Sequence, residues 1–143
     1  MSRKIRFLGQ TGNDDEPEFS DNDRGAVELS EEDKTIYLTG TMHDKQTAAF
    51  LRYWSRLEYL FAKKKIKKPL ITIIINSDGG GIFQGLAMNN KILSSSIPAK
   101  TIGIGRMNSA IILVFLAGKV RLLYRDTFIG FHRTQPDLVE DDD

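Results

Sequence analysis

The sequence of 143 residues contains no cysteine, only two histidines and one tryptophan, and four prolines. The lack of cysteine excludes disulfides, thiolate metal sites and a cysteine nucleophile. The longest apolar run, residues 110–117, is far shorter than the roughly 20 residues that a membrane-spanning helix needs. Residues 1–10 are basic but lack the apolar core of a secretory signal. We therefore expect one cytoplasmic domain without membrane contact.

The formal net charge of +1 hides a strong asymmetry along the chain. Residues 1–33 hold ten acidic and four basic side chains, and residues 137–143 add five acidic ones, whereas residues 34–136 hold sixteen Lys and Arg against four acids. This pattern predicts a basic core domain between two acidic tails, of which residues 1–33 are disordered. A basic surface attracts polyanions, but no aromatic-rich basic motif indicates nucleic acid as the partner.

The apolar periodicity predicts strands that alternate with helices. A helix of about five turns is expected from Asp44, taken as the N-cap, through Phe61. Further helices are expected over residues 82–93 and 109–117, the first with four buried side chains: Phe83, Leu86, Ala87 and Leu93. Strands are expected over residues 35–39, 70–75, 99–104, 120–124 and 128–131, and the nearly unbroken apolarity of residues 70–75 indicates burial on both faces. This order predicts an α/β domain with a mainly parallel sheet.

Two loops follow predicted strands, at the end of a parallel sheet where functional groups gather. Residues 76–81 include three consecutive glycines, which suit a tight turn, a phosphate or an oxyanion, although the Gly-Lys-Ser/Thr of a phosphate loop is absent. Ser109 closes the second loop and is either a helix N-cap or a nucleophile. His132 is either a buried ring or a base, and with only one other histidine it makes a poor metal site. Together these features are the minimum set for acyl transfer.

Five separated segments carry a more specific pattern: residues 73–81, 85–87 and 101–105, Ser109, and residues 128–132. In order and spacing they resemble the proteolytic subunit of the Clp protease family, and the resemblance covers about residues 35–135. It implies the crotonase-like fold, a spiral of β-β-α units with a mainly parallel sheet covered by helices. It also implies a serine endopeptidase that joins its own or homologous subunits in a ring. A partner unfoldase ATPase feeds that ring with polypeptides, so this chain needs no cofactor, because the partner uses the ATP.

The resemblance also implies roles for single residues. Ser109 falls on the nucleophile of the family and His132 on its general base, while Gly80 and Ala110 fall on the backbone donors of the oxyanion hole. Asp78 stands where the family has a turn proline, and a carboxylate there opposes a developing oxyanion unless it points to solvent. Residues 106–108, which are Arg, Met and Asn, stand where the family has small residues before the nucleophile.

The third member of the family's triad, an aspartate, lies well downstream of the histidine, beyond a long helix. This sequence ends eleven residues after His132 and has no counterpart in register. Without an orienting carboxylate, a catalytic imidazole can lose about ten-thousandfold in turnover. Two functions therefore stay open: a Clp-like endopeptidase completed by another polypeptide, or a catalytically impaired subunit that serves assembly. A polyanion-binding module and an acyl-CoA enzyme of the same fold are weaker alternatives.

Overall fold

The structure is a computed structural model that describes residues 25–131. Its elements are β1 (Ala26–Ser30), β2 (Thr35–Met42), α1 (Asp44–Lys63), β3 (Ile71–Gly80), α2 (Ile82–Ser94), β4 (Ala99–Asn108), α3 (Ile111–Leu116), β5 (Val120–Leu123) and β6 (Phe128–Gly130). The strands form one sheet in the order β1-β2-β3-β4-β5, and β6 also pairs with β4. Every pair except β1 with β2 is parallel, which confirms the predicted mainly parallel sheet.

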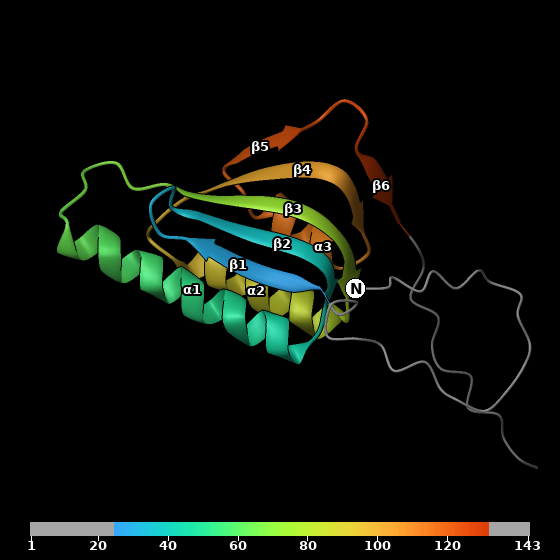
Figure 1. Cartoon of the computed structure of the whole chain (residues 1–143), viewed down its shortest axis with the longest axis horizontal. Coiled ribbons are helices and arrows are strands. Elements are labelled where there is room, and N and C mark those ends of the chain that lie inside the picture. Colours follow the sequence, from blue (N-terminus) through green and yellow to red (C-terminus); the bar gives the residue numbers. More distant parts are fainter. Residues whose placement is uncertain (1–24, 132–143) are drawn as a thin grey trace, which may run out of the picture.

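The three helices lie against the same face of this sheet (Figure 1). In β3 the side chains of Ile71, Ile73 and Ile75 are fully buried, whereas those of Thr72 and Ile74 on the other face are only half-buried. The prediction that this strand is buried on both faces is therefore wrong for the described chain. Crossovers between parallel strands are right-handed as a rule. When neighbouring strands also follow one another in the sequence, such crossovers place all their helices on the same face of the sheet.

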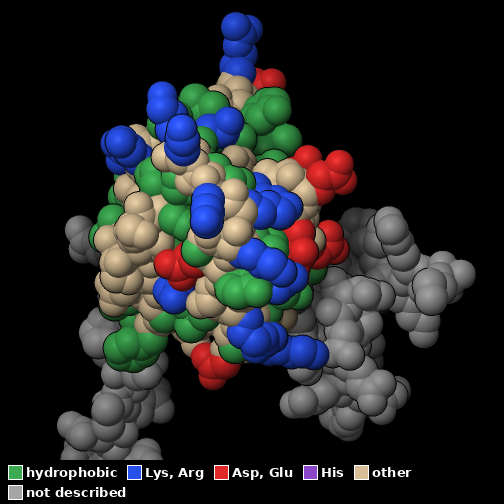
Figure 2. Space-filling model, turned by 90° about the vertical axis from the view of Figure 1, so that its left-hand side faces the viewer, with side chains coloured by type: hydrophobic (Ala, Val, Ile, Leu, Met, Phe, Trp, Pro, Cys, Tyr) green, Lys and Arg blue, Asp and Glu red, His purple; other side chains and the backbone are tan. Residues whose placement is uncertain are grey.

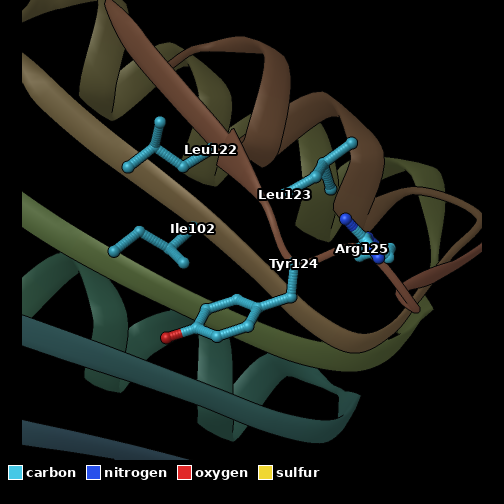
Figure 3. A pocket seen from close by; sticks show the side chains of 5 residues that line it. All are labelled: Ile102, Leu122, Leu123, Tyr124 and Arg125. Carbon is cyan, nitrogen blue, oxygen red and sulfur yellow. The ribbon is translucent and has the colours of Figure 1, made fainter.

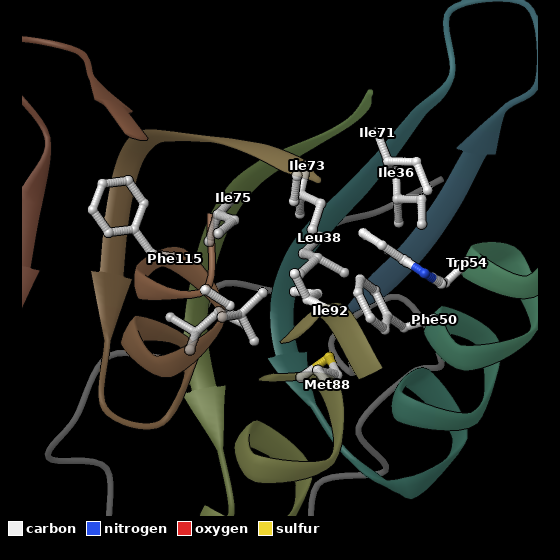
Figure 4. Close-up of a cluster of buried hydrophobic side chains, with 14 of the residues drawn as sticks. Ile36, Leu38, Phe50, Trp54, Ile71, Ile73, Ile75, Met88, Ile92 and Phe115 are labelled. Carbon is white, nitrogen blue, oxygen red and sulfur yellow. The ribbon is translucent and has the colours of Figure 1, made fainter. Parts of the chain in front are cut away.

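The core lies between the helices and the covered face of the sheet (Figure 4). The predicted helix face of α1 is confirmed, because Phe50, Trp54 and Leu57 are completely buried. The N-cap is His43 rather than Asp44, and its amide donates a hydrogen bond of 3.1 Å to the Gln46 side chain. Within residues 25–131, no helix combines the length and the apolarity needed to cross a membrane.

Strand β1 lies inside the stretch predicted to be a disordered tail, so that prediction is wrong for residues 25–33; residues 1–24 lie outside the described residues. β1 pairs with β2 along its whole length, and Val27 and Leu29 pack against the core. Two apolar residues among acidic neighbours are only a weak local signal for a strand. The long-range pairing with β2 satisfies the backbone and decides the conformation.

The buried face of α2 also differs from the prediction. Gly85, Met88 and Ile92 are buried, whereas Phe83 is 79% exposed and Leu93 is 65% exposed. A Cβ atom on Gly85 would lie 2.6 Å from the carbonyl oxygen of Ala110, so the helix approaches the backbone before α3 at its smallest residue. This close approach places Gly85, Met88 and Ile92 on the buried face and leaves Phe83 and Leu93 exposed.

Candidate active site

Both predicted loops prove to be the ends of strands, because β3 runs to Gly80 and β4 runs to Asn108. The pairing of the two strands shifts there: Ile75 lies opposite Gly103, but Ser77 lies opposite Met107. Residues 104–106 of β4 lie against the single residue Asn76 of β3 and form a bulge, a feature that often re-aims side chains beside active sites. The bulge brings the chain of β4 toward the end of β3.

Ser109 lies in the turn that joins β4 to α3 and has a φ angle of 58°. This left-handed conformation costs a residue other than glycine about 1–2 kcal/mol. The N-cap of α3 is Ala110, so the alternative that Ser109 serves as an N-cap is wrong. A strained serine between a strand and a helix is the arrangement in which α/β-hydrolases present their nucleophile. Ser109 is half-buried.

The glycine run packs directly against this turn. A Cβ atom on Gly79 would lie 2.4 Å from the carbonyl oxygen of Asn108, 3.1 Å from the Cβ of Ser109 and 3.3 Å from the amide nitrogen of Ala110. Gly79 also has a φ of 87°, so only glycine fits this position without strain. Gly80, the predicted oxyanion donor, follows directly and packs on β2, where an added Cβ would lie 1.9 Å from the carbonyl oxygen of Met42.

Sequence reasoning selected the glycine run but not Gly79 as the residue in contact. The three consecutive glycines were the available signal, and they do not show which of them touches the serine turn. The structure brings Gly79, Ser109 and Ala110 together from segments about thirty residues apart in the chain.

The Ser77 side chain supports the glycine run through two hydrogen bonds. Its side chain is completely buried; the hydroxyl donates a 2.6 Å hydrogen bond to the carbonyl oxygen of Gly40 and accepts one of 3.0 Å from the amide of Gly79. Two hydrogen bonds to a buried hydroxyl fix the backbone at the point where it turns toward Ser109.

Asp78 and Arg106 form a bidentate ion pair between the ends of β3 and β4. Arg106 Nε donates to Asp78 Oδ1, and Nη2 donates to Oδ2 at 2.8 Å. The hydrogen bond from Arg106 lowers the pKa of Asp78, and the same contact raises the pKa of Arg106. The carboxylate expected to oppose an oxyanion is therefore paired. Asp78 and Arg106 carry opposite charges, and both depart from the pattern of the family that the sequence resembles. Their opposite signs were a clue to this ion pair that the sequence-based prediction did not use.

The predicted base, His132, lies outside the described residues, two positions after the end of β6. Its role stays a prediction. Ala110, the second predicted oxyanion donor, is buried and follows Ser109 directly. In residues 25–131 no three His, Cys, Asp or Glu side chains gather into a group that could hold a metal ion.

A shallow groove of about 460 Å³ opens elsewhere on the sheet (Figure 3). It is lined by Ile102 of β4, by Leu122 and Leu123 of β5, and by Tyr124 and Arg125 after it. None of the site residues contributes to this lining. The groove is a mainly apolar surface feature separate from the serine turn.

Basic side chains gather on the face of the molecule shown in Figure 2. Five exposed lysines among residues 63–68 lie between the end of α1 and the start of β3. Because β3 is ten residues long, the start of this strand is roughly 30 Å from its end at Gly80. The lysines therefore lie at the opposite end of the sheet from Ser109 and contribute no charge to the site.

A family model described as Clp protease matches residues 25–134. The chain belongs to the Clp protease family. The match includes both strand ends and the serine turn, so the site described above is part of the Clp protease domain. No curated protein matches the sequence.

Solved structures of Clp proteases share the fold. A ClpP1 point mutant from Listeria monocytogenes matches 74% of this chain and 60% of its own, with a TM-score of 0.65 and 24% identity. The ClpP protease catalytic domain from Plasmodium falciparum matches 73% of this chain and 56% of its own, with a TM-score of 0.64 and 25% identity. These matches confirm the crotonase-like fold. The chain spans about 60% of the length of these Clp structures.

Proposed function

We propose that the chain is a serine-type endopeptidase subunit in which Ser109 is the nucleophile and His132 the general base. The backbone amides of Gly80 and Ala110 donate hydrogen bonds to the oxyanion. One observation carries this proposal: Ser109 is held at a φ of 58° directly against the backbone of Gly79. Residues held in sparsely populated backbone conformations cluster at active sites, which supports a functional role for this serine.

The chemistry proposed for this site has two steps. His132 takes the proton of the Ser109 hydroxyl while the oxygen attacks the peptide carbonyl, and the new oxyanion accepts hydrogen bonds from the two amides. The intermediate collapses as His132 returns the proton to the leaving amine. Water, activated by His132, then releases the acyl group from Ser109.

Labelling with a fluorophosphonate probe, followed by intact mass and peptide mapping, tests the proposal. We expect one probe per chain on Ser109, none in Ser109→Ala, and much slower labelling in His132→Ala. Ser94→Ala is the matched control, because Ser94 is exposed at the end of α2 and bonds only the carbonyl of Lys91. Labelling that survives Ser109→Ala, or wild-type protein that stays unlabelled in every assembly state, would overturn the proposal and leave a subunit that serves assembly alone.

We further propose that subunits associate with their own kind or with homologous subunits, and that an unfoldase ATPase supplies the polypeptide. Exposed apolar side chains along β5 and β6 support an association, since soluble monomers seldom present so many together: Leu122, Leu123, Tyr124, Phe128 and Phe131 are 47–80% exposed. Size-exclusion chromatography with light scattering is the test. A monomer at all concentrations, alone and with a complete homologue, would contradict the association.

A further inference from the structure

The ion pair of Asp78 and Arg106 connects the two chain segments that form the candidate site. Asp78 directly precedes Gly79, and Arg106 lies three residues before Ser109. Both side chains are about half exposed, at 43% and 45%. A planar guanidinium that binds both oxygens of a carboxylate fixes the relative orientation of the two groups, which a single contact does not.

Further contacts from the end of β4 strengthen the same junction. The amide of Arg106 donates a hydrogen bond of 3.3 Å to Oδ1 of Asn76, and the side chain of Asn108 adds to the lowering of the pKa of Asp78. Both interactions run between the end of β4 and the last residues of β3. The ion pair is thus the centre of a polar network that ties the glycine run to the serine turn.

The charge of Asp78 matters for the proposed chemistry as well as for the geometry. A carboxylate close to a developing oxyanion raises the energy of the transition state, because like charges repel. Arg106 cancels that charge at the carboxylate itself. Removal of the guanidinium alone leaves the negative charge beside the site, whereas removal of both groups leaves none.

We propose that Arg106 and Asp78 act as a positioning pair, in which Arg106 holds the glycine run against the Ser109 turn and masks the Asp78 carboxylate. The masking part rests on the proposed function of Ser109. The positioning part concerns backbone order alone and is measurable in a protein of any activity.

Hydrogen exchange tests the positioning part. The reporters are two amides: that of Gly79, bonded to Ser77 Oγ, and that of Ser109, bonded to the carbonyl oxygen of Gly130. In Arg106→Met both amides should exchange several-fold faster than in the wild type. Arg56→Met is the matched control, since Arg56 and Glu31 form an ion pair of similar exposure far from these amides, and it should leave both unchanged. Unchanged exchange in Arg106→Met would overturn the positioning role.

The rate of probe labelling tests the masking part. Arg106→Met should label Ser109 about tenfold more slowly than the wild type, and higher ionic strength should recover part of that loss. Asp78→Asn added to Arg106→Met should also recover part of the loss, because the unpaired charge is gone. A double variant no faster than Arg106→Met would overturn masking while leaving Ser109 as nucleophile. A wild-type protein that takes no label contradicts the proposed function and the masking that depends on it, and hydrogen exchange still decides the positioning.

Discussion

The backbone amide of Ser109 donates a hydrogen bond of 3.0 Å to the carbonyl oxygen of Gly130. This bond ties the serine turn to the last residue of β6, which also lies opposite Asn108 in the sheet. His132 follows two residues later in the chain. The serine turn is thus held from two sides, by the glycine run at the end of β3 and by β6. Its strained conformation is stable because these neighbours over-determine it.

Gly79→Ala should disrupt the site. The new methyl group would lie 2.4 Å from the carbonyl oxygen of Asn108, at a φ of 87°. We expect a loss of about 2 kcal/mol or more in the free energy of unfolding, because backbone atoms on both sides have to move. Urea unfolding measures this loss, and probe labelling should fall with it.

Gly81→Ala is the control for that substitution. Gly81 has an extended conformation with a φ of −67°, and the atoms nearest to the added methyl group would belong to the flexible side chain of Gln84 rather than to the backbone. We expect a change of less than about 0.5 kcal/mol. If the two variants were equally stable, the close contact of Gly79 with the serine turn would be refuted.

Ser77→Ala should weaken the support of the glycine run. The substitution leaves the carbonyl of Gly40 and the amide of Gly79 without their buried partner. Loss of a buried hydrogen-bonding group that leaves its partners unpaired typically costs about 1–3 kcal/mol of stability. Thermal unfolding followed by circular dichroism measures the loss, with the exposed Ser94→Ala as reference. A melting temperature equal to that of the reference would contradict this bracing role.

The contribution of the Asp78–Arg106 pair to stability should depend on pH. Arg106 lowers the pKa of Asp78 below its ordinary value of 3.8 in the folded state. A lowered carboxyl pKa stabilises the fold at every pH above the ordinary value, and this contribution disappears as the pH falls through the lower folded value. Because the pair is half exposed, solvent screening limits its contribution to about 0.5 kcal/mol.

Urea titrations of the wild type and Arg106→Met at neutral pH and near pH 2.5 test this dependence. The difference between the two proteins should be present at neutral pH and should shrink in acid. A difference that grows in acid would show that Arg106 stabilises the fold by a contact other than its ion pair with Asp78.

Much of the fold followed from local patterns in the sequence. The spacing of Phe50, Trp54 and Leu57 predicted α1 because a helix repeats its buried face every three to four residues. The β-branched run of β3 and the order of elements predicted the mainly parallel sheet. The motif spacing also named Ser109 and the glycine run as site segments, and the structure brings these segments together.

Local patterns did not predict the features that depend on neighbours distant in the chain. β1 forms because β2 offers a partner, and the buried face of α2 follows from its approach to Ala110 through Gly85. The apolar sequence of β3 predicted that the strand is buried. It did not show which face of the strand the helices cover.

The sequence by itself determined the kinds of element, their order and the residue types available for chemistry, because these depend on hydrophobic period and on side-chain identity. Only the tertiary structure decided that Gly79 is the glycine in contact with Ser109, and that Asp78 is neutralised by Arg106. Both relationships join segments about thirty residues apart. They arise from the bulge in β4 and the register of two parallel strands, which no pattern within either segment encodes.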